Sequence, residues 1–209
     1  MENRTAELSA NKMRIIPYAK GKKTITFYDT FVDMNGDVVR FDDIAIFQSN
    51  AMNSSSMIYF YFSKSFEYNF TFTTYDGTKH RFHRHGYSGY GIGTYKRIKE
   101  EFETVAGPMY DIVLTAVVRR LIEKIENGAK ANIMGLEITK DKIVYEKRKK
   151  TIVIDRSNFD RAINNNGMSN TAQIYVRDEK KPVFNCSLAG DNAKLIVPIV
   201  NYFFSYKPM

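Results

Sequence analysis

One β-rich pattern occurs twice in this chain and limits the folds that it can adopt. Residues 135–159, GLEITKDKIVYEKRKKTIVIDRSNF, alternate apolar and polar positions between short charged segments. Such alternation indicates half-buried strands joined by tight turns. A diverged copy at 25–44, ITFYDTFVDMNGDVVRFDDI, shows the same order of strands and turns. This repetition predicts two copies of one β-rich unit.

Amphipathic helices are predicted near the end of each half of the chain. Residues 94–126 have a helical pattern that is interrupted at Gly107 and Pro108, because proline disrupts a helix interior. The stripe after this interruption comprises Ile112, Val113, Ala116, Val117, Arg120, Leu121 and Ile125. A final helix is predicted with Asp191 as its N-cap, and Pro198 within its apolar stripe requires either a kink or a later start of the helix. One such helix in each half would cover the apolar face of an antiparallel sheet.

Turn and boundary signals divide the chain into three parts. Residues 1–23 are predicted to form an N-terminal arm, either a short helix or a mobile segment. The first β-rich unit is expected at 24–128, where Gly128 is a typical left-handed helix cap. The second unit is expected at 131–209. Within the first unit, the Asn- and Ser-rich residues 48–56 are expected to be a loop.

The clearest strand pair is predicted in the first unit. In residues 66–73, FEYNFTFT, aromatic side chains alternate with polar ones, which places four aromatics on one face of a sheet. Asp76 and Gly77 are expected to close this strand onto residues 79–84. Earlier in the unit, Asn35 and Gly36 form a strong hairpin signal, because both residues tolerate positive φ.

Both copies resemble the bacterial pleckstrin-homology-like (PH-like) domains. In the second copy the matching residues are Ile138, Thr139, Asp141, Ile143, Tyr145, the basic residues 147–150, residues 151–153 and Phe159. In the first copy they are Ile25, Thr26, Asp29, Phe31, Asn35, Gly36 and residues 39–44. The resemblance implies an α+β, mainly β fold of tandem PH-like domains, each an antiparallel two-sheet half-barrel closed by a C-terminal helix. It also implies a non-enzymatic binding or self-assembly module, because lipid headgroups, peptides and self-association all occur on this scaffold.

The charge of the chain favours anionic partners. The sequence of 209 residues has 31 basic and 23 acidic residues, a net charge of +8. Four consecutive basic residues, Lys147, Arg148, Lys149 and Lys150, occupy a predicted hairpin tip and are the candidate anion-binding site. They would contact the phosphates of a lipid headgroup or of nucleic acid, unless they only keep a strand edge soluble. The alternative function is therefore a nucleic-acid-associated or anionic-lipid-binding protein.

Other candidate constellations are weaker. His83 and His85 would share one face of a strand and His80 the other, and no third metal ligand can be named. The glycine-rich residues 87–93 match no nucleotide-binding motif, so a hinge or a loop between sheet and helix is the better interpretation. Asp42 and Asp43 would point to opposite faces of a strand, which favours a turn role over shared acid–base chemistry. No catalytic residue, metal site or cofactor is predicted.

The remaining features concern the cellular compartment. Cys186 is the single cysteine, so no intrachain disulfide is expected, and its strand context predicts a small core residue. The sequence contains no apolar run of about 20 residues that could cross a bilayer. The first residues also lack the hydrophobic region of a signal peptide. These features predict a cytoplasmic protein without a membrane span, with a protein partner or a second copy left open.

Overall fold

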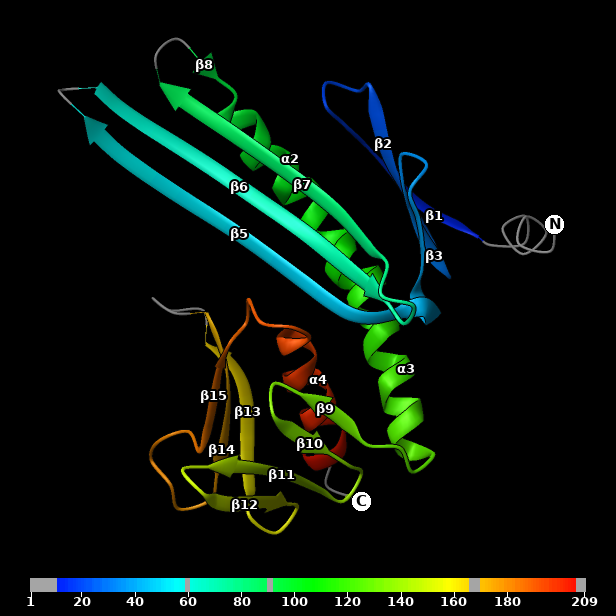
Figure 1. Cartoon of the computed structure of the whole chain (residues 1–209), viewed down its shortest axis with the longest axis vertical. Coiled ribbons are helices and arrows are strands. Elements are labelled where there is room, and N and C mark those ends of the chain that lie inside the picture. The colour runs from blue at the N-terminus through cyan, green and yellow to red at the C-terminus, as the bar shows by residue number, and fades with distance from the viewer. Residues whose placement is uncertain (1–10, 59–60, 90–91, 166–169, 206–209) are drawn as a thin grey trace. The chain divides into compact units, whose positions relative to one another are not determined.

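The computed structural model describes residues 11–58, 61–89, 92–165 and 170–205. Antiparallel strands form four sheets, accompanied by helices, which agrees with the predicted mainly β, α+β class (Figure 1). The chain divides into two compact units, residues 1–117 and 118–209. This division falls earlier than the boundary at 128–131 expected from the sequence.

The first unit contains two antiparallel meanders. The first has the order β1-β2-β3-β4 and the second the order β5-β6-β7-β8. The strands are β1 (Lys12–Tyr18), β2 (Lys23–Tyr28), β3 (Phe31–Met34), β4 (Val38–Arg40), β5 (Ile44–Ile58), β6 (Tyr61–Thr74), β7 (Lys79–Gly89) and β8 (Ile92–Gly93). A short 3-10 turn, η1 (Phe41–Asp43), connects the two meanders. Figure 1 shows β5, β6 and β7 as three long strands side by side.

A nearly continuous helical region follows the sheets of the first unit. It consists of α2 (Tyr95–Pro108), the π-helical segment η2 (Met109–Leu114) and α3 (Thr115–Glu126). The break expected at Gly107 and Pro108 is thus a change to wider turns, which accommodate a proline that has no amide hydrogen. The predicted end of the helix is confirmed, because Gly128 has a φ of 89° and its amide donates to the Ile125 carbonyl at 3.0 Å.

The second unit has the same kinds of elements in shorter form. Its sheets have the orders β9-β10-β11-β12 and β13-β14-β15. The elements are β9 (Ala131–Ile133), β10 (Leu136–Ile138), β11 (Lys142–Lys147), β12 (Lys150–Asp155), β13 (Phe159–Asn165), β14 (Thr171–Val176), β15 (Phe184–Ser187) and α4 (Ala193–Phe204). The expected N-cap Asp191 is wrong by one residue, since Asn192 precedes the helix in a left-handed conformation and makes no side-chain cap bond among the described residues.

The two units share a local irregularity as well as an order of elements. A β-bulge interrupts both β5 and β13 next to the first residue of the strand. Just before the bulge, the Asp43 carbonyl accepts a hydrogen bond from the Tyr75 amide at 3.0 Å. At the matching place, the Asn158 carbonyl accepts one from the Arg177 amide at 2.8 Å. Because bulges are specific features of a fold, their recurrence supports the duplication predicted from the sequence.

Three segments predicted to be irregular are strands instead. Residues 12–18 of the expected N-terminal arm form β1, which pairs with β2 along its length. The expected loop at 48–56 lies inside β5, and residues 87–89 extend β7. Asn, Ser and Gly, which are frequent in residues 48–56 and 87–89, have low strand propensity, but hydrogen bonding to β6 outweighs that preference here. Residues 1–10 of the predicted arm lie outside the described residues.

Candidate functional site

The basic tip consists of Lys147, Arg148, Lys149 and Lys150 and joins β11 to β12. Lys147 lies opposite Lys150, and Arg148 and Lys149 form the turn with φ values of 50° and 65°. Two consecutive left-handed residues are the signature of a type I′ hairpin turn. This geometry favours Asn and Gly, because a β-carbon crowds the backbone at positive φ. The basic pair therefore occupies a turn for which its residue types are poorly suited.

The matching turn of the first unit has the preferred residues. Asn35 and Gly36 join β3 to β4 with φ values of 61° and 96°. The amide of Gly36 also donates to the Asp33 carboxylate at 2.6 Å, which stabilises the turn further. The two units therefore build the same turn with different chemistry, and only the second unit has a basic one.

A second basic turn adjoins the basic tip. All four side chains of the tip are exposed, and the Lys147 ammonium donates to the Val183 carbonyl at 3.0 Å. The Tyr145 hydroxyl donates to the same carbonyl. Val183 ends the connection between β14 and β15, which also contains the exposed Lys180 and Lys181. Figure 1 shows these two connections side by side in the second unit.

The resulting cluster is predominantly cationic. It joins the four residues of the tip with Lys180 and Lys181, and we refer to these six residues as the basic cluster. Within the described residues, none of the six forms an ion pair. The acidic residues in the same two connections are Asp178 and Glu179, and Glu146 directly precedes the tip. The cluster thus has an excess of positive charge in solvent, where it can contact anionic groups.

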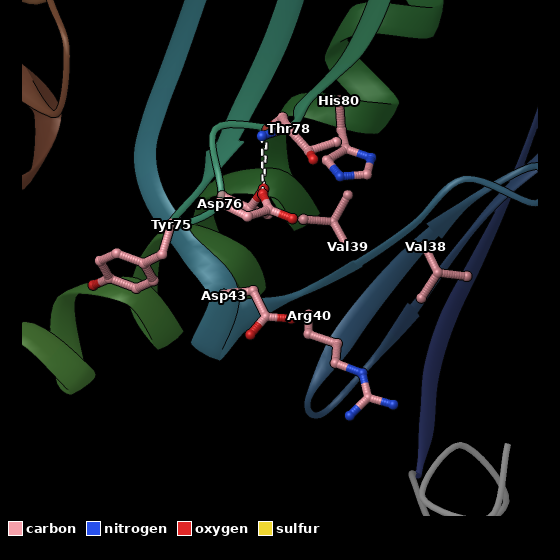
Figure 2. Close-up of a pocket in the computed structure, with 9 residues that line it drawn as sticks. Val38, Val39, Arg40, Asp43, Tyr75, Asp76, Thr78 and His80 are labelled. Atoms are coloured by element: carbon pink, nitrogen blue, oxygen red, sulfur yellow. Dashed lines mark hydrogen bonds between the residues drawn. The ribbon is translucent and has the colours of Figure 1, made fainter. Parts of the chain in front are cut away.

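The first unit has a cleft near the equivalent turns. It encloses about 570 Å³ and is lined by Val38, Val39, Arg40, Asp43, Thr74, Tyr75, Asp76, Thr78 and His80 (Figure 2). The Asp76 carboxylate accepts hydrogen bonds from the Thr74 hydroxyl and from the Thr78 amide at 2.9 Å, and these lower its pKa. The cleft is therefore lined by side chains of both charge signs, and the Asp76 carboxylate is hydrogen-bonded to neighbouring residues of its own turn.

Two of the three histidines are held by separate carboxylates. His80 Nδ1 lies 2.6 Å from an Asp37 oxygen, and His83 Nε2 lies 2.9 Å from a Glu67 oxygen. Among the residues that the structure describes, no group of three His, Cys, Asp or Glu side chains is placed to hold a metal ion. Two histidines of this strand are thus engaged in pairwise bonds within the first unit, and the third, His85, is exposed.

Gly86 allows a close approach between β7 and α2. A β-carbon built on Gly86 would lie 2.8 Å from Ile98 Cβ and 2.9 Å from the Thr94 carbonyl oxygen. The Thr94 hydroxyl also accepts a hydrogen bond from the Tyr87 amide at 2.9 Å. This part of the glycine-rich segment brings the start of the helix against the strand, while residues 90–91 lie outside the described residues.

Asp42 and Asp43 of the first unit and Asp155 of the second lie in matching turns. Asp42 and Asp43 belong to η1. In the second unit, Asp155 accepts hydrogen bonds from the Ser157 amide at 2.8 Å and from the Ser157 hydroxyl, which lower the pKa of its carboxyl. The position of Asp42 and Asp43 in a 3-10 turn agrees with the turn role expected for them. Cys186 is half-buried in β15, and burial raises the pKa of its thiol, which disfavours the reactive thiolate.

One polar network in the first unit was not foreseen from the sequence. Glu101 in α2 accepts hydrogen bonds from the Tyr68 hydroxyl at 2.9 Å and from Arg84 at 2.6 and 3.1 Å. The Ala19 amide adds a longer one at 3.4 Å. Burial is the main cause of the raised pKa of Tyr68, and the bond to Glu101 is the main cause of the raised pKa of Arg84. Four donors saturate the carboxylate, so the network anchors α2 on β6 and β7.

Comparison with known proteins adds no family. A scan against models of known protein families and a search of curated proteins each found no match to this chain. Among the described residues, no helix combines the length and the apolar character that crossing a bilayer requires.

Proposed function

We propose that this chain is a non-enzymatic binding protein of two PH-like units, which binds a phosphate-bearing partner through the basic cluster of its second unit. The repeated order of two meanders followed by a helix supports the PH-like interpretation, since the resemblance implies that order. The saturated and paired state of Glu101, His80 and His83 favours binding over catalysis.

The conformation of Arg148 and Lys149 is the observation that carries this proposal. A left-handed turn would be more stable with Asn and Gly, as in the first unit. Two basic residues at this position lower stability without any gain in turn geometry. Backbone strain of this kind is concentrated at functional sites. Contact with phosphate would explain why this turn has Arg148 and Lys149, although its backbone conformation disfavours both residues.

An anionic lipid surface is the partner that fits this arrangement best. The six cations lie on two adjoining hairpin connections, and adjoining tips can reach a flat surface together. Each cation near such a surface contributes about 1 kcal/mol, so the cluster would contribute about 6 kcal/mol at most. That corresponds to a dissociation constant of tens of micromolar. Nucleic acid presents the same phosphate chemistry and is the alternative.

Replacing Lys147, Arg148, Lys149 and Lys150 by Ser is expected to weaken binding to phosphatidylserine vesicles about a hundredfold or more. Vesicle co-sedimentation at low and moderate salt measures this, with neutral phosphatidylcholine vesicles for comparison. A matched control replaces Lys12, Lys22, Lys23 and Lys99, four exposed lysines of the first unit, by Ser. The control removes the same net charge and should retain most of the binding.

Three outcomes of this experiment would change the proposal. Equal losses in the tip variant and the control would show that only net charge matters. Binding to duplex DNA or RNA without binding to vesicles would select the nucleic-acid alternative. A parent protein that binds neither at low salt would leave the basic tip as a solvated turn.

Replacing Arg148 by Asn together with Lys149 by Gly is expected to change stability and binding in opposite directions. The variant copies the turn of the first unit, so its free energy of unfolding should rise by about 1 kcal/mol. Vesicle binding should fall, because two cations are lost. Urea titration and co-sedimentation measure the two effects. A loss of stability would contradict the role assigned to the left-handed turn.

A further inference from the structure

The outer edge of β5 is a long strand edge in the first unit. β5 has 15 residues and, among the described strands, it pairs only with β6 (Figure 1). Residues 50–57 are exposed although they lie within a strand. The backbone amides and carbonyls along such an edge are able to bond another strand.

This edge lacks the features by which proteins block edge pairing. Charged residues, proline and short strands are the usual ones. Residues 50–58, NAMNSSSMI, contain neither a charged residue nor a proline. The equivalent edge strand of the second unit, β13, has only 7 residues and contains Asp160 and Arg161. One chain therefore protects one of two matching edges and leaves the other long and uncharged.

We propose that a second copy of this chain pairs with the outer edge of β5 in antiparallel orientation, so that the two β5 strands join their sheets. The proposal rests on β5 and is independent of the basic cluster. A two-fold axis perpendicular to the sheet relates the two copies and keeps each face of the strand on the same side. A register centred on Ser54 pairs the whole of residues 50–58 with itself.

The composition of this segment fits a second copy in particular. When a strand pairs with the same strand of a second copy, a charged side chain near the two-fold axis lies close to the same charge on its partner. The chain as a whole has a net charge of +8, so such repulsion would be common elsewhere on its surface. Residues 50–58 avoid this repulsion because they are neutral. In the register centred on Ser54, Met52 lies opposite Ser56 and Met57 opposite Ala51. Met52 and Met57 are 55% and 73% exposed, so pairing would cover apolar surface that the single chain leaves in water.

Lysines on the edge test this proposal. Ser54→Lys with Ser56→Lys places charge on the outer strand, and Ser63→Lys with Ser65→Lys is the matched control on β6. The control residues are the cross-strand neighbours of the edge residues. The hydroxyl oxygens of Ser54 and Ser65 lie 2.6 Å apart, and those of Ser56 and Ser63 lie 2.7 Å apart. Both variants remove the same two hydrogen bonds and add lysines to the same face.

Sedimentation equilibrium of the full chain measures the result. The parent is expected to be a dimer at tens of micromolar, and the edge variant should raise its dissociation constant about tenfold or more. The control variant should stay close to the parent. A monomeric parent would overturn the proposal. The alternative partner for the β5 edge would then be an extended segment of another protein. Equal dissociation of both variants would also overturn it, because the edge would then have no special role.

A cysteine trap tests the same contact without relying on dissociation. Ser54→Cys in a Cys186→Ser background places one thiol near the two-fold axis of the dimer. Mild oxidation should give a covalent dimer on a non-reducing gel. Ser65→Cys in the same background lies one strand further from the axis and should cross-link much more slowly. Equal cross-linking at the two positions would contradict pairing through β5.

Discussion

Glu101→Ala is expected to lower the free energy of unfolding by about 3 kcal/mol, because it leaves several buried groups without their partner. The Glu101 side chain is only 9% exposed, and Arg84, which donates two hydrogen bonds to it, is 22% exposed. Removal of the carboxylate also leaves the Tyr68 hydroxyl unbonded in the core. Urea titration of the whole chain, followed by circular dichroism, measures the loss.

Two further variants separate this network from ordinary helix effects. Glu103→Ala makes the same chemical change at an exposed position of α2 and should cost less than about 0.5 kcal/mol. Arg84→Met combined with Glu101→Leu removes both charges, and apolar packing should recover part of the lost stability. Equal effects of Glu101→Ala and Glu103→Ala would show that the network does not anchor α2.

Gly86→Ala is expected to lower the free energy of unfolding by about 1–3 kcal/mol, as overpacking of a close contact does. Its new β-carbon would lie under 3.0 Å from both Ile98 Cβ and the Thr94 carbonyl, so strand and helix would have to separate. Gly93→Ala is the matched control, because its β-carbon would meet no described atom within 4 Å. Thermal and urea unfolding of both variants measure the difference, and equal stability of the two would contradict the close approach.

The strand pattern of the chain could be predicted because it is local. The alternation in residues 66–73 placed Phe66, Tyr68, Phe70 and Phe72 on one face, and all four are buried. Asn35 and Gly36 form the expected hairpin turn with positive φ. Periodicity and turn residues act over a few neighbouring positions, so they can be read without knowledge of the tertiary structure.

Two strands could not be predicted from local patterns. Residues 48–56 have the composition of a loop, yet they belong to β5 because β6 pairs with them along their length. Residues 12–18 join the first sheet in the same way, through β2. In both cases the hydrogen bonds come from another strand, and single-sequence patterns do not contain that partner.

For the candidate site as well, local features could be predicted from the sequence and features that depend on packing could not. Four consecutive basic residues on a hairpin tip, between two strands of alternating pattern, could be predicted without the structure. The left-handed conformation of Arg148 and Lys149, and the hydrogen bond from Lys147 to the Val183 carbonyl beside Lys180 and Lys181, became known only from the fold. Charge and turn propensity are properties of neighbouring residues, whereas the joining of two hairpin connections depends on how the two sheets of the unit pack.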